Sequence, residues 1–249
     1  MDLGLAGKVA LVTGASKGLG KGIGAALVQE GARVAISSRS RERIDAAATE
    51  IGALGLVHDS ADVDAVPALV DAVEAQLGPI EVLVANTGGP PPGPDPLGFT
   101  REQWESAYRD LVLAPMTLIE RVVPGMRERG FGRVLSVSSS AVREPIPGLM
   151  LSNSHRAALL GALKTLAREV AGEGVTVNSV LPGRIATDRI VQMSGSREAA
   201  EDAARSQVPV GRLGTVEEFA AVAAFVCSER ASYINGTAIL VDGGLTQAV

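Results

Sequence analysis

The sequence contains very little of what metal centres and disulfide frameworks are made of. Its 249 residues include one cysteine, Cys227, and two histidines, His58 and His155. A single cysteine cannot form an internal disulfide, and no Cys/His cluster has the spacing of a zinc site. We therefore expect no metal cofactor, and a fold held together by its apolar core.

Long apolar runs and blocks of like charge are also missing. No segment reaches the ~18 uninterrupted apolar residues that span a bilayer. The short apolar run at the N-terminus lacks the basic leader of a signal peptide. Lysine and arginine are scattered and the net charge is −5, which argues against a nucleic-acid partner. We expect a cytoplasmic globular protein with no membrane partner.

What the chain does contain is a regular alternation of short apolar runs with longer helical segments. Continuously apolar runs are typical of parallel strands covered on both faces. The β–α alternation predicts a three-layer, doubly wound α/β fold of the Rossmann type, with a seven-stranded, mainly parallel sheet in one domain over 1–249. The predicted strands are 8–13, 33–37, 55–58, 81–86, 133–138, 176–181 and 238–242. The predicted helices are 18–30, 41–52, 63–77, 101–129, 151–172 and 216–228.

Two irregular stretches stand apart from this alternation. Residues 87–98 carry five prolines and directly follow a predicted strand end, so we expect a stiff loop beside the site; an ordinary connection is the simpler alternative. Residues 184–212 have weaker strand signals. For them we expect a flexible helical flap over the substrate side.

A glycine-rich turn joins the first strand to the first helix. In "TGASKGLG", Gly14, Gly18 and Gly20 allow a tight turn and let the backbone approach a pyrophosphate at the positive end of the helix. A purely structural turn is the alternative. The position between the first strand and the first helix favours a dinucleotide site.

The residues after the second strand indicate which dinucleotide binds. An NAD site places a carboxylate there for the ribose 2′-hydroxyl, whereas an NADP site places a cation. This chain has Ser38 followed by Arg39, with Lys17 in the glycine turn. Each cation alone could be a solvated surface charge, but together they favour NADP(H) over NAD(H). Asp59, after the third strand, is a candidate acceptor for the adenine amine or a simple turn residue.

These motifs resemble the short-chain dehydrogenase/reductase family, in particular its 3-oxoacyl-acyl-carrier-protein reductase branch. The similar segments span nearly the whole chain: "TGASKGLG", "ANTGG" (85–89), "GRVLSVSSS" (132–140), "VNSVLPGRIAT" (177–187) and "YINGTAILVDGG" (233–244). The resemblance implies an oxidoreductase acting on a small carbonyl or acyl substrate. It also implies a homotetramer, or a mixed tetramer with a paralogue, assembled through helices 101–129 and 151–172.

The resemblance also assigns cofactor contacts to particular positions. They are Gly14, Ser16, Lys17, Gly18, Leu19, Arg39, Asp59, Ser60, Asn86, Gly88, Arg156, Pro182, Gly183 and Thr187.

The catalytic set is where this chain departs from the family, which uses Asn, Ser, Tyr and Lys. The serine is present as Ser139. The tyrosine position, thirteen residues after the serine, holds Ser152, and the lysine position four residues further holds Arg156. The asparagine position, seven residues after Trp104, holds Leu111. The resemblance therefore implies a degenerate site in which three of the four groups are replaced.

These replacements remove the family's proton donor. An aliphatic hydroxyl such as that of Ser152 is far more basic than a phenol and several ångströms shorter. Arg156 can hold ribose hydroxyls and supply positive charge, but it does not give up its proton. His155 is a candidate replacement acid or a partner of Ser152 in a hydrolytic pair. We favour the alternative that it is a polar residue lining a pocket or an interface.

Three functions remain open from the sequence. The first is an atypical NADP(H)-linked oxidoreductase with weak or absent family-type activity. The second is a non-catalytic NADP-binding sensor, or an inactive subunit that supports an active paralogue. The third, a hydrolase or lyase using Ser152 and His155, ranks last. Arg184, after Pro182 and Gly183, either meets an acidic substrate or is solvated.

Overall fold

One seven-stranded sheet organises the protein. In the computed structural model, which describes residues 1–248, the strand order is β3-β2-β1-β4-β5-β6-β7 and every neighbouring pair is parallel. Each predicted strand is present, and the predicted doubly wound α/β fold is confirmed. The strands are β1 (Val9–Val12), β2 (Arg33–Ser38), β3 (Leu54–Val57), β4 (Val82–Ala85), β5 (Gly132–Val137), β6 (Val175–Pro182) and β7 (Ala238–Val241).

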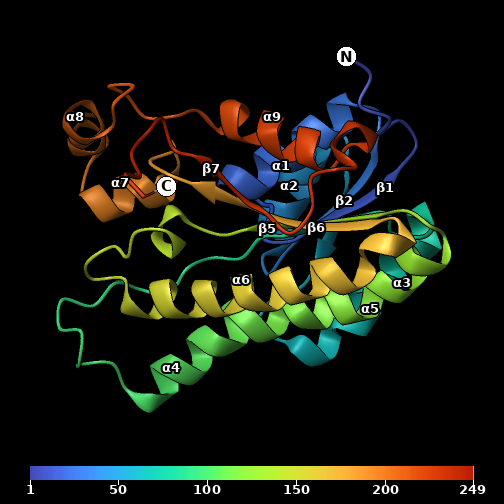
Figure 1. The fold of residues 1–249 in the computed structure, drawn as a ribbon, viewed down its shortest axis with the longest axis horizontal. Coiled ribbons are helices and arrows are strands. Elements are labelled where there is room, and N and C mark those ends of the chain that lie inside the picture. Colours follow the sequence, from blue (N-terminus) through green and yellow to red (C-terminus); the bar gives the residue numbers. More distant parts are fainter. Residues whose placement is uncertain (249) are drawn as a thin grey trace.

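Helices cover both faces of the sheet, as the apolar strands require. One face carries α1 (Gly18–Gln29), α2 (Arg41–Ile51) and α9 (Val216–Val226); the other carries α3 (Val66–Leu77), α5 (Ala114–Glu128) and α6 (Met150–Val170) (Figure 1). The helices α7 (Asp188–Ser194) and α8 (Arg197–Gln207) lie together at one end of the molecule. They form within 184–212, where we expected helices; that this segment moves as a flap remains a prediction.

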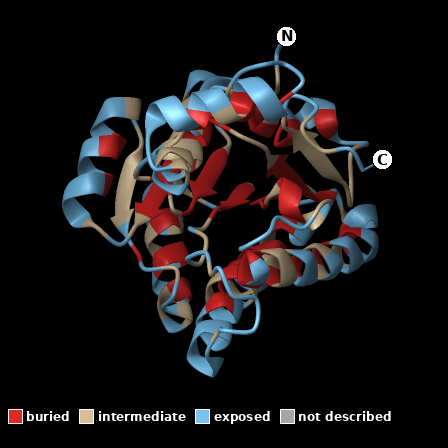
Figure 2. Cartoon of the chain, turned by 90° about the vertical axis from the view of Figure 1, so that its left-hand side faces the viewer, coloured by how far each residue is buried: buried red, intermediate tan, exposed pale blue. Residues whose placement is uncertain are grey.

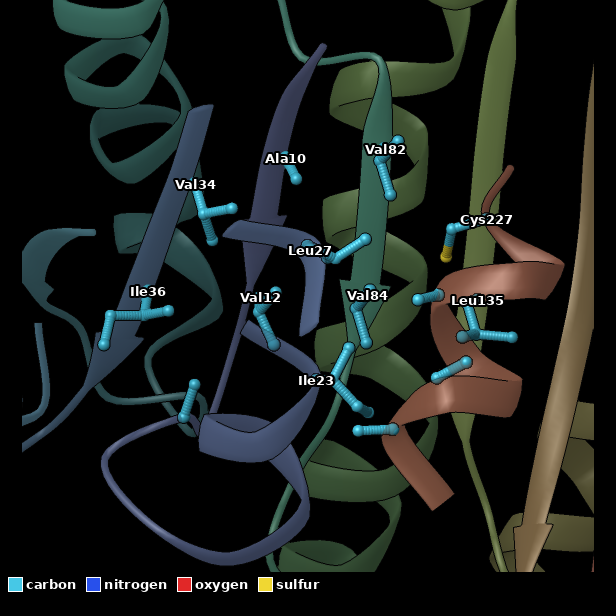
Figure 3. Close-up of a cluster of buried hydrophobic side chains, with 14 of the residues drawn as sticks. Ala10, Val12, Ile23, Leu27, Val34, Ile36, Val82, Val84, Leu135 and Cys227 are labelled. Carbon is cyan, nitrogen blue, oxygen red and sulfur yellow. The ribbon is translucent and has the colours of Figure 1, made fainter. Parts of the chain in front are cut away.

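The core lies between the sheet and these helix layers. Ile23 and Leu27 of α1 lie against the strands beside Val12 and Val84 (Figure 3), and all four side chains are fully buried. Burying one such side chain contributes roughly 1.5–3 kcal/mol. The central strands are mainly buried, the edge strands β3 and β7 are mainly intermediate, and the outward faces of the helices are exposed (Figure 2). The sheet is therefore a rigid platform for the loops at its carboxyl edge.

The segment predicted as one helix over 101–129 is helical without a break from Arg101 to Glu128, but it contains a π-helical turn that the prediction did not include. It consists of α4 (Arg101–Tyr108), a π-helical turn η2 (Arg109–Leu113) and α5. Pro115 has no N–H, so the regular hydrogen-bond ladder cannot run through this point. The N–H of Ala114 instead donates to the carbonyl of Arg109, five residues back.

Within residues 1–248, no helix is both long and apolar enough to cross a membrane.

Candidate functional site

The site lies at the carboxyl ends of β1 and β4, where the strand order reverses. Thr13 Oγ1 donates to the carbonyl of Asn86 at 2.9 Å, and the N–H of Asn86 donates back to Thr13 Oγ1 at 3.1 Å. The Asn86 side-chain amide donates to the carbonyls of Thr13 at 3.1 Å and Gly14 at 2.9 Å. Ligands bind at such a switch point in open α/β sheets. Asn86 therefore holds together the two loops between which a nucleotide would lie.

The glycine turn has steric reasons for its composition. Gly14 has φ +58°, and a Cβ there would lie 2.6 Å from the carbonyl oxygen of Asn86. A Cβ at Gly20 would lie 2.6 Å from Asn86 Nδ2. Side chains at these positions would push the two loops apart, so both glycines keep the turn closed.

This turn leaves the N-terminus of α1 open to a ligand. Lys17 occupies the N-cap, and among the described residues no side chain caps the first amides of α1. Uncapped helix amides carry partial positive charge and bind phosphate oxygens. The cradle of small residues and the open helix end together fit the pyrophosphate of a dinucleotide.

A cavity of about 590 Å³ extends from this helix end across the carboxyl edge of the sheet. It brings together most of the residues that the sequence singled out. Those lining it are Lys17, Gly18, Leu19, Gly20, Asn86, Gly88, Ser139, Ser152, Arg156, Pro182, Gly183, Arg184 and Thr187.

The remaining predicted residues do not line this cavity. Gly14 and Ser16 belong to the glycine turn itself, while Arg39, Asp59 and Ser60 follow the ends of β2 and β3. Arg39 and Asp59 are exposed, and both influence Asp110. The pKa of the Asp110 carboxyl is raised by burial and by the Asp59 charge, while Arg109 and Arg39 oppose the rise. Charged groups from β2, β3 and η2 thus gather at the end of the site next to β2.

At the other end, Ser152 and Arg156 form a pair one turn apart on α6. Arg156 Nε donates to Ser152 Oγ at 3.2 Å, and Arg156 Nη1 donates to the carbonyl of Val137 at 3.0 Å. Burial, together with the positive charge of Arg189, lowers the pKa of Arg156 to about 10. The guanidinium therefore stays charged at neutral pH.

Ser139 lies at the end of β5 and faces the same cavity. Its Oγ accepts the N–H of Ala141 at 3.1 Å, which orients the hydroxyl and starts a short helical turn. The hydroxyls of Ser139 and Ser152 and the guanidinium of Arg156 can donate hydrogen bonds into one space. They can orient a carbonyl oxygen, but none is a good proton donor at neutral pH.

His155 is not brought to this group. Its Nδ1 lies 2.7 Å from the carbonyl oxygen of Leu151, and its ring packs 5.4 Å from that of Trp104 and 6.4 Å from that of Tyr108. It does not line the cavity. This placement on the side of α4 disagrees with a shared site for Ser152 and His155. It also disagrees with a role in lining this cavity, so a position at an interface remains a prediction.

Leu111 lies in η2 and is 2% exposed. Its side chain offers no hydrogen bond to a water or a ligand. The π-helical turn therefore places a buried apolar group at this point of the chain.

Sequence reasoning missed several cavity residues. Arg189 of α7 reaches back to the proline-rich loop, where Nη1 donates to the carbonyl of Gly89 at 3.2 Å and Nη2 to that of Pro90 at 3.4 Å. Glu144 and Leu245, which follows β7, also line the cavity. Nothing in the local sequence around Arg189 indicates this long-range contact. The proline-rich loop itself was correctly expected beside the site.

Over the described part of the chain, no group of three or more His, Cys, Asp or Glu side chains is placed to hold a metal ion.

Comparisons with known proteins identify the class to which this fold and site belong. A family described as Enoyl-(Acyl carrier protein) reductase matches residues 14–246. The chain is 37% identical to human dehydrogenase/reductase SDR family member 4 over 246 residues, covering 96% of this chain and 88% of that protein. It is 32% identical to the 3-oxoacyl-[acyl-carrier-protein] reductase of Escherichia coli strain K12 over 250 residues, covering 96% and 97%. The chain belongs to the short-chain dehydrogenase/reductase family.

A solved structure has nearly the same fold. L-sorbose reductase from Gluconobacter frateurii, complexed with NADPH and L-sorbose, superposes with a TM-score of 0.94 at 31% identity, covering 100% of both chains.

Proposed function

We propose that this protein is an atypical NADP(H)-linked oxidoreductase of small carbonyl or acyl compounds, related to 3-oxoacyl-acyl-carrier-protein reductases. The observation that carries the proposal is the intact nucleotide cradle. The open N-terminus of α1, the closed glycine turn and the Asn86 bridge are all retained. The L-sorbose reductase that shares the fold binds NADPH.

The charges around the cradle support NADP(H) over NAD(H). Arg39 follows β2 where an NAD-binding chain would place a carboxylate. Lys17 Nζ bonds to Asp188 at 2.9 Å, and both side chains are largely exposed. Because an exposed ion pair is worth only ~0–1 kcal/mol, the ammonium is free to turn towards a phosphate. We assign the nucleotide to the cofactor residues named from the sequence, with Arg39 at the 2′-phosphate.

Bound NADPH supplies the hydride in reactions of this family. Around the carbonyl, we assign Ser139 and Ser152 to hold the oxygen by hydrogen bonds. Arg156 stabilises negative charge that develops on that oxygen, since its guanidinium remains protonated. No phenol stands at position 152 to give a proton, and general acid catalysis is typically worth ~10²–10⁴ in rate. We therefore expect slow turnover by the family's mechanism.

A second candidate function is a non-catalytic NADP-binding sensor, or an inactive subunit in a mixed tetramer with an active paralogue. The buried Leu111 favours it, because that apolar side chain leaves no polar group at the position where the family has asparagine. Trp104 and Tyr108 of α4 are partly exposed, and α4 to α6 would supply the subunit contacts of a homotetramer or mixed tetramer. For both candidates we propose a cytoplasmic protein.

NADPH binding and carbonyl reduction separate these functions. We expect NADPH fluorescence to saturate at micromolar protein, NADH to bind more weakly, and slow reduction within a panel of 3-oxoacyl thioesters and small ketones. Saturable binding without any reduction would favour the sensor. Failure to bind either nucleotide would contradict both functions.

The flap has its own test. If 184–212 closes over the site, hydrogen exchange in α7 and α8 slows when NADPH is added, whereas exchange in α3 stays unchanged. Equal exchange with and without NADPH would contradict a moving flap.

A further inference from the structure

The charged residues of the cavity are unevenly paired. Lys17 bonds to Asp188, and Arg184 Nη2 donates to Gln207 Oε1 at 2.6 Å. Glu144 accepts the backbone N–H groups of residues 247 and 248. The partner of Arg184 is therefore uncharged, and the same holds for Arg156 and Arg189: within residues 1–248 their hydrogen-bond partners are a serine hydroxyl and backbone carbonyls.

The exposed side chain of Arg189 contacts the loop after β4. A Cβ built at Gly89 would lie 2.5 Å from Nη2 of Arg189. Asp188, the preceding residue, bonds instead to Lys17 at the N-terminus of α1.

The charge of Arg189 lies close enough to Arg156 to disfavour the charged form of Arg156. Burial lowers the pKa of both, and the charge of Arg189 lowers that of Arg156 further. An anion bound to Arg189, whose side chain is exposed, would offset this repulsion of the more buried Arg156. A planar guanidinium matches a carboxylate by two parallel hydrogen bonds.

The wall beside these cations is apolar. Ile146, Leu149, Ile190 and Met193 line the cavity around Arg189 and Ser152. The cavity therefore combines an apolar surface with the guanidinium of Arg189, which can bind an anion. The same cavity contains the hydroxyls of Ser139 and Ser152, which would hold a carbonyl oxygen.

We propose that the substrate is an oxo acid with an apolar chain, whose carboxylate is bound by Arg189 while its carbonyl lies at Ser152 and Arg156. This inference rests on the proposed oxidoreductase function and names its substrate class. The shared chemistry, an anionic oxygen on Arg189, could also come from a cofactor phosphate, so the test separates the two.

The test compares an acid with its ester. 2-Oxo-4-phenylbutanoate and its ethyl ester are titrated calorimetrically into protein saturated with NADP⁺, which cannot reduce them. We expect the acid to bind at least ~10-fold more tightly than the ester. Arg189→Gln should weaken the acid ~10–100-fold, the range for charge-assisted hydrogen bonds, and leave the ester within ~2-fold.

Two further variants sharpen the assignment. Gly89→Ala keeps the charge of Arg189, but the added methyl group displaces the guanidinium from its position beside residue 89. This variant should therefore also bind the acid with less preference over the ester. Arg205→Gln is the matched control, because Arg205 lies on α8, pairs with Asp202 and does not line the cavity. It should change neither affinity.

Four outcomes would overturn the inference. Two concern the unmodified protein: it binds acid and ester equally, or it shows no measurable binding of the acid. The other two concern Arg189→Gln: it loses the same affinity for both ligands, or it binds NADPH more weakly while its preference for the acid over the ester stays unchanged. A protein that binds no NADPH contradicts the proposed function instead. The acid and ester titrations on ligand-free protein would then still decide the role of Arg189.

Discussion

Arg156 and Arg133 are both largely buried arginines, yet we predict opposite effects on stability when each is replaced by methionine. Arg133 is 4% exposed and donates to the carbonyls of Ser228 at 3.0 Å, Gly132 at 2.9 Å and Gly174 at 3.3 Å. Its guanidinium also lies 4.3 Å from the centre of the Phe131 ring. Arg156 has two neutral partners and faces the cavity.

The size of each effect can be worked from these contacts. The fall in the pKa of Arg156 to about 10 means that its charged form costs the folded state ~3 kcal/mol, at ~1.4 kcal/mol per pH unit. Methionine removes that cost and two hydrogen bonds worth ~1 kcal/mol each. Arg156→Met should therefore raise the ligand-free unfolding free energy by ~1 kcal/mol, or ~2–4 °C in Tm.

Arg133→Met should do the reverse. It removes three hydrogen bonds worth ~1 kcal/mol each, although the carbonyl of Gly174 still accepts the N–H of Gly132. Burial also lowers the pKa of Arg133, so removing its charge offsets part of this loss, and the unfolding free energy should fall by ~2 kcal/mol. Urea unfolding and thermal melts of both variants, with and without NADPH, measure this contrast. Arg156→Met should also lose most of the stabilisation that NADPH gives. A destabilisation of Arg156→Met as large as that of Arg133→Met would refute the view that Arg156 is an unpaired charge awaiting a ligand.

Three further predictions concern other residues. Arg39→Asp should weaken NADPH by ~10–100-fold and reverse the preference towards NADH, measured by nucleotide fluorescence; an unchanged preference would contradict the assignment of Arg39 to the 2′-phosphate. Burial raises the pKa of Cys227 to about 12, so Ellman's reagent should label it only at the rate of unfolding, and rapid labelling of native protein would count against the core described here. Hydrogen bonds from Arg212 and Thr215 lower the pKa of Glu218 to about 2. The stability that the charged carboxylate contributes is therefore fully present above the ordinary carboxyl pKa and is lost as pH falls through about 2. Glu218→Gln should flatten the acid side of a plot of Tm against pH, and an unchanged plot would contradict this.

The fold could be predicted from the sequence because its determinants are local. Apolar runs such as residues 81–86 specify buried parallel strands, and the glycine turn needs only its own residues and Asn86. Thr100 precedes Gln103, and Thr215 precedes Glu218, by the three residues typical of a capping box, and both capping boxes are present in the structure. The gathering of Ser139 with Ser152 and Arg156 followed from the residue spacing of the family: Ser139 comes just after β5, and the other two lie one turn apart on α6.

The rest depends on contacts between distant segments. Arg189 bonds to Gly89, which is 100 residues away in the sequence, and no periodicity in the sequence predicts such a contact. His155 and Ser152 are three residues apart on α6, yet His155 turns to Trp104 and only Ser152 reaches the cavity. The π-helical turn that contains Leu111 ends just before Pro115, and the helical pattern in the sequence does not distinguish a regular α-helix from one that contains such a turn.

The central claim is that this protein keeps the nucleotide site of its family but lacks the proton donor. The most direct measurement compares NADPH-dependent carbonyl reduction by the unmodified protein with that of a variant carrying Leu111→Asn, Ser152→Tyr and Arg156→Lys, after both have been shown to bind NADPH and to unfold cooperatively. The account predicts slow turnover by the unmodified protein and a gain of ~10²-fold or more in the variant, within the range of general acid catalysis. Fast reduction by the unmodified protein, with a loss of rate in the variant, would contradict it.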